Sequence, residues 1–287
     1  MTRLAVTWLD VFTREPLQGN PLAVVHDADE LDDATMLAFA RETHLSETTF
    51  VQRATAQGAD YRNRIFDPRQ ELAFAGHPSL GTAVAVARRR GEAEVSYVQQ
   101  TPAGMQPIDV RVDGDCARAS MLQEPARFGP ELEPRAVLAL AGLGEEDADP
   151  ELPVQVVSTG IPQVLAPVAD SAALARARPD WAGIEALLDE HEAIVLYLVC
   201  CDPRAGRARA RAFTHSAEMG EDPATGSAAG PLCAYLAERT GRRDVVIEQG
   251  VEMGRPSRLE CRLDGARVRV AGDAVVVMDA TLAVPGS

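Results

Sequence analysis

The chain has 287 residues, of which 46% are hydrophobic and 25% are charged, a composition that supports a sizeable core and excludes a disordered chain. Its 28 basic residues are all arginines, and 43 acidic residues bring the formal net charge to −15. This charge argues against a nucleic-acid partner, because phosphates would be repelled. The lack of lysine excludes Schiff-base catalysis and a lysine-containing phosphate loop.

The chain carries no sign of export or membrane insertion. Residues 1–10 alternate like a strand and contain no apolar signal segment. The longest apolar run, residues 193–201, reaches about half of the ~18 residues that a membrane span needs. We therefore expect a cytoplasmic protein with no membrane partner. The five cysteines share no short paired spacing, so we expect buried thiols, no disulfide framework and no metal site; they are Cys116, Cys200, Cys201, Cys233 and Cys261.

Short stretches rich in Val, Leu, Tyr and Phe recur along the chain, and their alternation predicts antiparallel strands. Polar-capped helices are predicted at 32–43 and 179–190. The predicted strands cover residues 3–9, 47–53, 60–66, 93–99, 105–112, 115–122, 153–157, 161–168, 193–200, 207–213, 243–249, 257–263 and 266–271.

The length of the chain exceeds what one core usually organises, so we expect two lobes. The segment 123–152 is rich in acidic residues and proline and suits a connection between them. The N-terminal lobe is then 1–122, completed by a C-terminal strand at 273–283, and the C-terminal lobe is 153–272.

Two further helices, predicted at 78–88 and 223–236, consist of small and apolar residues with almost no charge. A helix that is apolar around its whole circumference is buried on all sides. We therefore expect an α+β fold in which each lobe wraps a sheet around one central helix.

The two central helices belong to a duplicated pattern. Residues 77–83 match residues 222–228 as x-Pro-x-x-Gly-[Ser/Thr]-Ala, with an offset of 222 − 77 = 145. Upstream, Arg64-x-Phe66 matches Arg211-x-Phe213, with an offset of 211 − 64 = 147. The letters thus predict two related lobes, with a linker two residues shorter in the second copy.

The prolines of this pattern predict where the helices begin. Proline favours the first helical position, which makes His77 and Asp222 the expected N-cap residues. The first N–H groups of each helix would then point outward at the positive end of the dipole, and two such ends facing each other would bind a small carboxylate. Residues expected to contribute N–H groups, hydroxyl groups or space for the ligand are Gly76, Ser79, Leu80, Gly81, Thr82, Ala224, Thr225, Gly226 and Ser227.

Each candidate also has a purely structural interpretation. Asp222 could simply cap its own helix, since Asp is a favoured N-cap. Histidine is a poor cap, so His77 favours a functional role, and neutral imidazole could bind substrate. Glu47 lies where a helix gives way to an apolar strand, which could desolvate it, raise its pKa and suit it to proton transfer. An isolated glutamate at a strand start also commonly faces solvent.

Four segments in order, 19–24 (GNPLAV), 45–50 (LSETTF), 74–81 (FAGHPSLG) and 220–228 (GEDPATGSA), strongly resemble the PhzF family of phenazine-biosynthesis isomerases. The resemblance extends from about residue 5 to 283. It implies the fold of diaminopimelate epimerase, namely two pseudo-symmetric lobes, each a curved, mostly antiparallel sheet around a central helix, with the active site between them. It also implies a homodimer.

For mechanism, the resemblance implies cofactor-free isomerisation of a small carboxylate such as trans-2,3-dihydro-3-hydroxyanthranilate. Glu47 would remove a proton and return one elsewhere on the ring. His77, Asp222 and Ser227 would hold and polarise the substrate, and the helix starts would bind its carboxylate. The substrate-binding residues expected from the motifs are Gly76, Ser79, Gly226, Ser227 and Asn20.

Two other functions remain open from the sequence. The protein could be an epimerase of an amino-acid-like acid, with Glu47 and either His77 or Asp222 as the acid–base pair. A two-thiol racemase is not expected, because Pro78 and Pro223 lie about where the family resemblance would place the thiols. The protein could also be a non-catalytic binder of small acids, although a binder has no need of a proton-carrying glutamate.

Overall fold

The computed structural model describes residues 1–284 and divides into two compact units. Unit 1 comprises Met1–Met121 together with the chain from Ala271 onward, and unit 2 comprises Leu122–Val270. Two chain crossings therefore join the units, one within β8 (Cys116–Leu122) and one within the long strand β17 (Arg267–Val284).

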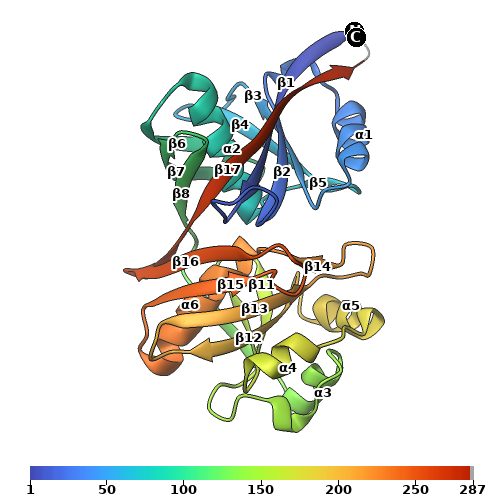
Figure 1. The fold of residues 1–287 in the computed structure, drawn as a ribbon, viewed down its shortest axis with the longest axis vertical. Coiled ribbons are helices and arrows are strands. Elements are labelled where there is room, and N and C mark those ends of the chain that lie inside the picture. The colour runs from blue at the N-terminus through green and yellow to red at the C-terminus, as the bar shows by residue number, and fades with distance from the viewer. Residues whose placement is uncertain (285–287) are drawn as a thin grey trace. The chain divides into compact units, whose positions relative to one another are not determined.

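In unit 1 the strand pairings run in a closed ring around the helix α2 (Gly76–Arg90). β17 pairs with β1, β1 with β2, β2 with β3, β3 with β4, β4 with β6, β6 with β7, β7 with β8, and β8 again with β17 (Figure 1). The other elements are β1 (Thr2–Val11), β2 (Asn20–Val25), η1 (Ala28–Glu30), α1 (Asp33–Thr43), β3 (Thr48–Gln52), β4 (Tyr61–Phe66), β5 (Glu71–Leu72), β6 (Glu94–Thr101) and β7 (Gly104–Asp113).

In unit 2 the strand order is β9, β10, β11, β12, β13, β15, β16, and α6 (Gly226–Thr240) contacts β10, β11, β15 and β16. The three helices α3, α4 and α5 pack their apolar side chains onto a separate core cluster that includes Phe213. The elements are β9 (Arg127–Glu131), α3 (Pro134–Ala139), η2 (Glu145–Asp147), β10 (Gln155–Ser158), β11 (Pro162–Pro167), α4 (Ser171–Arg176), α5 (Trp181–Glu190), β12 (Leu196–Asp202), β13 (Arg207–Phe213), β14 (Glu221–Asp222), β15 (Asp244–Gln249) and β16 (Ser257–Asp264).

The segment 123–152, expected as a connection, is instead part of unit 2. Its strand β9 pairs with β10, and Val137 and Leu138 of α3 are buried in the core cluster of that unit. The high proline and acidic content that suggested a linker reflects the exposed edge of this segment, where all of β9 is exposed.

Four strand pairs are parallel rather than antiparallel: β2 with β3, β4 with β6, β11 with β12, and β13 with β15. Helices occupy the connections between the strands of each pair, as parallel pairing requires. The alternation of side chains has a period of two in both kinds of strand, so it could not distinguish them.

The prediction of two buried central helices is confirmed. Every residue of α2 from Gly76 to Ala87 is buried, and α6 is buried from Ala228 to Leu236. Gly81 serves this packing: a Cβ there would lie 2.6 Å from a Leu22 methyl carbon and 2.8 Å from one of Val11. The space at Gly81 is thus filled by the core and offers no room for a ligand.

The duplication is present, but the two copies align with a different offset from the one that the sequence motif indicated. Both central helices have 15 residues, and each ends at a glycine in the left-handed conformation, Gly91 and Gly241. Each follows a two-residue strand whose glutamate pairs with the phenylalanine of the Arg-x-Phe motif. The offset between the helices is therefore 226 − 76 = 150, and the second linker is three residues longer, not two shorter.

In both units the motif arginine holds this short strand. Arg64 donates from Nε and Nη2 to the two carboxylate oxygens of Glu71, at 2.8 and 2.6 Å. Arg211 binds Glu221 in the same way, at 2.9 and 2.7 Å. Paired N–H donors match a carboxylate in one plane and so fix orientation as well as distance. The guanidinium carbons lie 5.2 and 4.9 Å from the ring centres of Phe66 and Phe213, respectively.

Candidate active site

The structure brings Glu47, His77 and Asn20 together in unit 1. Asn20 is the first residue of β2, Glu47 precedes β3, and His77 lies in the first turn of α2. Glu47 Oε2 lies 3.5 Å from His77 Nε2, and the exposed fractions of these side chains are 19% and 5%. Asn20 is fully buried, and its Nδ2 lies 3.2 Å from His77 Nδ1. Glu47 is therefore sheltered yet accessible, whereas its two neighbours are enclosed.

The contact with Asn20 determines the tautomer of His77. An amide nitrogen can only donate, so His77 Nδ1 accepts and the proton of the neutral ring is on Nε2, facing Glu47. The Ser46 hydroxyl is compatible with this orientation of the amide and donates to Asn20 Oδ1 at 3.5 Å. The reverse orientation would turn a lone pair of Nε2 toward the Glu47 carboxylate.

Burial also keeps His77 uncharged. Desolvation lowers the pKa of His77 to about 3, because the charged imidazolium loses its hydration inside the protein. At neutral pH the ring is therefore a weak base and a hydrogen-bond donor through Nε2. Within residues 1–284 His77 Nε2 has no hydrogen-bond partner, so its 3.5 Å approach to Glu47 Oε2 is a close contact between a neutral ring and a carboxylate, not a hydrogen bond or an ion pair.

Acidification below about pH 6.5 is expected to destabilise the protein through His77 and His26, the latter with its pKa lowered to about 4, chiefly by burial. The unfolded chain binds a proton on each ring near pH 6.5, whereas the folded chain does so only near pH 3 and 4. The free energy of unfolding should therefore be flat above about pH 7 and fall below it, by up to about 1.4 kcal/mol per pH unit for each histidine. Urea unfolding between about pH 7.5 and 5.5 measures this slope.

Two variants separate the histidine contribution from other titrations. His26→Gln should make the slope shallower, while His44→Asn, which replaces an exposed histidine in the left-handed conformation, should keep the wild-type slope. An unchanged slope in His26→Gln would contradict the assignment.

The expected N-caps were wrong in both units. The helix α2 begins at Gly76 with Ala75 as N-cap, and α6 begins at Gly226 with Thr225 as N-cap. Pro78 lies within the first turn of α2, where a missing N–H group costs nothing. Because proline is tolerated at more than one position of this turn, it does not show at which residue the helix begins. Asp222 lies in β14, where it pairs with Ala212.

Ser79 is bound to the start of α2, and its role in substrate binding stays a prediction. Its side chain is fully buried, its hydroxyl donates to the Ala75 carbonyl oxygen at 2.8 Å, and its N–H donates to the same oxygen at 3.3 Å. Both donors therefore serve the start of α2.

In unit 2, Gly226 and Ser227 open α6. With the offset of 150 they are the counterparts of Gly76 and His77, so the two units present Gly-Ser and Gly-His at equivalent positions. The first N–H groups of a helix have no partner within it, which makes both dipeptides candidate carboxylate-binding elements. Asp222 and Ser227 are partly exposed.

A model of the PhzC-PhzF family, described as phenazine biosynthesis-like protein, matches residues 9–280. The chain belongs to this family. It is 40% identical over 268 residues, covering 92% of this chain and 91% of the other, to the trans-2,3-dihydro-3-hydroxyanthranilate isomerase of Pseudomonas aeruginosa. A solved structure of a predicted epimerase from Pseudomonas aeruginosa has a TM-score of 0.87 at 35% identity, with 99% and 100% of the two chains covered.

A hydroxyproline epimerase from Agrobacterium vitis shares the fold, with a TM-score of 0.66 at 14% identity and coverage of 98% and 91%. The fold is thus the diaminopimelate epimerase-like fold that the motifs implied, and this member of the PhzC-PhzF family is an enzyme of the isomerase class.

The thiols of this PhzC-PhzF protein are not acid–base groups of the two helix starts. No cysteine occurs in residues 72–79 or 222–229. Burial raises the pKa of Cys233 to about 12 and that of Cys261 well above its ordinary value, so both thiols stay protonated. Within residues 1–284, no cluster of His, Cys, Asp and Glu could hold a metal ion, and no helix is long and apolar enough to span a membrane.

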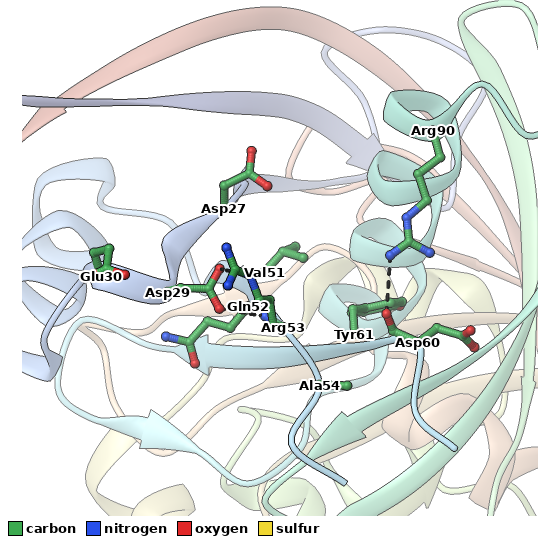
Figure 2. Close-up of a pocket in the computed structure, with 10 residues that line it drawn as sticks. All are labelled: Asp27, Asp29, Glu30, Val51, Gln52, Arg53, Ala54, Asp60, Tyr61 and Arg90. Atoms are coloured by element: carbon green, nitrogen blue, oxygen red, sulfur yellow. Dashed lines mark hydrogen bonds and ion pairs between the residues drawn. The ribbon is translucent and has the colours of Figure 1, made fainter. Parts of the chain in front are cut away.

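A hollow of about 400 Å³ in unit 1 lies away from Glu47 (Figure 2). It is lined by residues 27–30, 51–54 and 60–61 and by Arg90, which donates to the Asp60 carbonyl oxygen at 3.2 Å. Arg90 ends α2, thirteen residues after His77, or about 20 Å along the axis. Among the side chains that line the hollow, Arg53 forms an ion pair with Asp29. We assign the hollow no part in the chemistry.

Sequence reasoning missed two residues of unit 2 that contact Asp222 directly or through each other: Tyr197 and Gln249. Thr225 was expected to contribute its N–H group, but the role of its hydroxyl was not predicted. Tyr197 and Gln249 are isolated polar residues in predicted strands, and no local pattern distinguishes them from exposed ones.

Proposed function

We propose that the protein isomerises a small unsaturated carboxylate, of the kind represented by trans-2,3-dihydro-3-hydroxyanthranilate, by moving a proton through Glu47. The observation that carries this proposal is the sheltered Glu47 carboxylate 3.5 Å from Nε2 of a neutral histidine. The relative at 40% identity that acts on this compound supports the choice of substrate class.

In this mechanism Glu47 takes a proton from the carbon beside the hydroxyl-bearing carbon. The electron pair of that C–H bond forms a new double bond, and the existing double bond shifts its pair to a more distant carbon. Glu47 then returns the proton to that carbon, so the atoms and electrons balance without any cofactor. One sheltered carboxyl group can do both steps if water is excluded.

His77 acts in this proposal as a donor, not as a second base. Because burial holds its pKa near 3, the neutral ring has little tendency to accept a proton at neutral pH. Its Nε2–H, which has no hydrogen-bond partner within residues 1–284, can donate to a substrate oxygen beside Glu47. In unit 1 the backbone N–H group of Gly76 is available for a substrate carboxylate. In unit 2 the start of α6 at Gly226, with Ser227 and Asp222, offers a second set of polar groups for a substrate.

Proton NMR in heavy water tests the proposal against the alternatives. With trans-2,3-dihydro-3-hydroxyanthranilate, the expected result is migration of the double bond, with the new C–H proton drawn partly from the substrate itself. Exchange of a single α-proton with inversion of an amino acid, and no migration, would instead establish an epimerase and overturn the proposal. Tight binding of the compound without turnover, seen as a raised melting temperature, would indicate a binder.

The low pKa of His77 argues against an epimerase that uses Glu47 and His77 as its two acid–base groups. Such an enzyme needs a protonated acid opposite its base, and a ring with a pKa near 3 carries no second proton at neutral pH.

A further inference from the structure

A chain of buried polar side chains in unit 2 ends at Asp222. Tyr197 on β12 and Gln249 at the end of β15 are fully buried, and Thr225 is 5% exposed. The Tyr197 hydroxyl donates to Gln249 Oε1 at 2.9 Å, and the Thr225 N–H donates to the same oxygen at 3.2 Å. Gln249 Nε2 contacts the Asp222 carbonyl oxygen at 2.7 Å and Thr225 Oγ1 at 3.0 Å.

The direction of each hydrogen bond in this chain is fixed. Burial raises the pKa of Tyr197 well above its ordinary value, so the phenol keeps its proton and Gln249 Oε1 accepts. Gln249 Nε2 then donates to Thr225 Oγ1. A hydroxyl group has one hydrogen, and that of Thr225 goes to Asp222 Oδ2, at 2.5 Å.

Two observations indicate that this series of hydrogen bonds does more than stabilise the fold. Thr225 is the N-cap of α6, a position where a threonine oxygen normally accepts from the helix's own N–H groups, yet its side chain makes no cap hydrogen bond. In unit 1 the counterparts of Thr225 and Asp222, by the offset of 150, are Ala75 and Leu72. The same strand, turn and helix therefore form without a hydroxyl or a carboxylate at these positions.

We propose that Thr225 and Gln249 are positioning residues that hold the Asp222 carboxylate in one orientation for substrate. The inference rests on the proposed function. Gln249 holds the backbone of Asp222 and the hydroxyl of Thr225, and that hydroxyl in turn holds one oxygen of the Asp222 carboxylate. With its backbone and one oxygen held, the carboxylate has a single orientation. A group that must contact a polar substrate atom requires such a fixed orientation.

The test compares Thr225→Val, which keeps the shape but removes the hydroxyl, with Thr225→Ser, which keeps it. Thr225→Val is expected to lower kcat/KM by about 10- to 100-fold, mostly through KM, because it removes a hydrogen bond to a charged group. Thr225→Ser should restore most of the loss. In an Asp222→Asn background, Thr225→Val should add little further loss, whereas a merely structural role would give additive effects.

Crystal structures of the two variants test the positioning without any assay. The Asp222 carboxylate should turn away from its wild-type orientation in Thr225→Val and keep it in Thr225→Ser. An unchanged carboxylate in both variants, or additive losses in the Asp222→Asn background, would overturn the inference. A wild-type protein inactive on the candidate substrate would overturn the proposed function, and the crystal comparison would still decide the positioning.

Discussion

Glu47→Gln is expected to lower kcat by about 10²- to 10⁴-fold, the range typical of a lost general acid–base group. Glutamine has the shape of glutamate and can take the same position beside His77 Nε2, so the fold should persist. It cannot take up a proton at neutral pH. The measurement is steady-state turnover of trans-2,3-dihydro-3-hydroxyanthranilate, with circular dichroism to check the fold.

The matched control is Glu42→Gln, which makes the same change at an exposed position of α1 and should retain wild-type turnover. Glu47→Gln should also stop the transfer of substrate hydrogen observed in heavy water. Turnover of Glu47→Gln within about twofold of wild type would remove Glu47 from the mechanism.

Arg211→Met is expected to reduce the free energy of unfolding by about 3–5 kcal/mol, the usual effect of breaking a buried ion pair from one side. Arg211 is 6% exposed, and besides Glu221 it donates to the carbonyl oxygens of Leu174 and Ala177 at 3.1 and 3.0 Å. The variant leaves the Glu221 carboxylate without its partner and both carbonyl groups without this donor. Urea unfolding measures the change.

Most of this loss in the free energy of unfolding should come from the Glu221 carboxylate, which is left without its partner. The double variant Arg211→Met/Glu221→Leu, which removes both charges, should therefore regain a substantial part of the stability. The control Arg207→Met, at an exposed position of the same strand, should change the free energy of unfolding by less than about 0.5 kcal/mol. A single variant as stable as this control would show that the paired arginine is dispensable.

The sequence predicted the two buried helices well because composition alone decides such burial. An alanine- and glycine-rich helix without charge has no face that favours water, and the structure buries α2 and α6 accordingly. The start of α6 was misplaced because proline is tolerated both before a helix and throughout its first turn. Aligning Pro78 with Pro223 therefore paired His77 with Asp222, where the backbone pairs His77 with Ser227.

The candidate site was predictable only in part for a different reason. The motifs contain Glu47, His77 and Asp222, but what surrounds each of them comes from distant segments. Asn20 reaches His77 across 57 residues of chain, and Gln249 reaches Thr225 across 24. Such contacts follow from the strand order, including parallel pairs that side-chain alternation cannot reveal, so they became visible only with the fold.

The shared strand β17 sets an order for events during synthesis. It leaves unit 2 and ends beside β1, where Val284 lies opposite Thr2. While the chain emerges from the ribosome, every residue of unit 2 is available before unit 1 can close its ring. The strand β1 must therefore wait for β17, and this wait makes unit 1 the half with the greater exposure to chaperones and to misfolding.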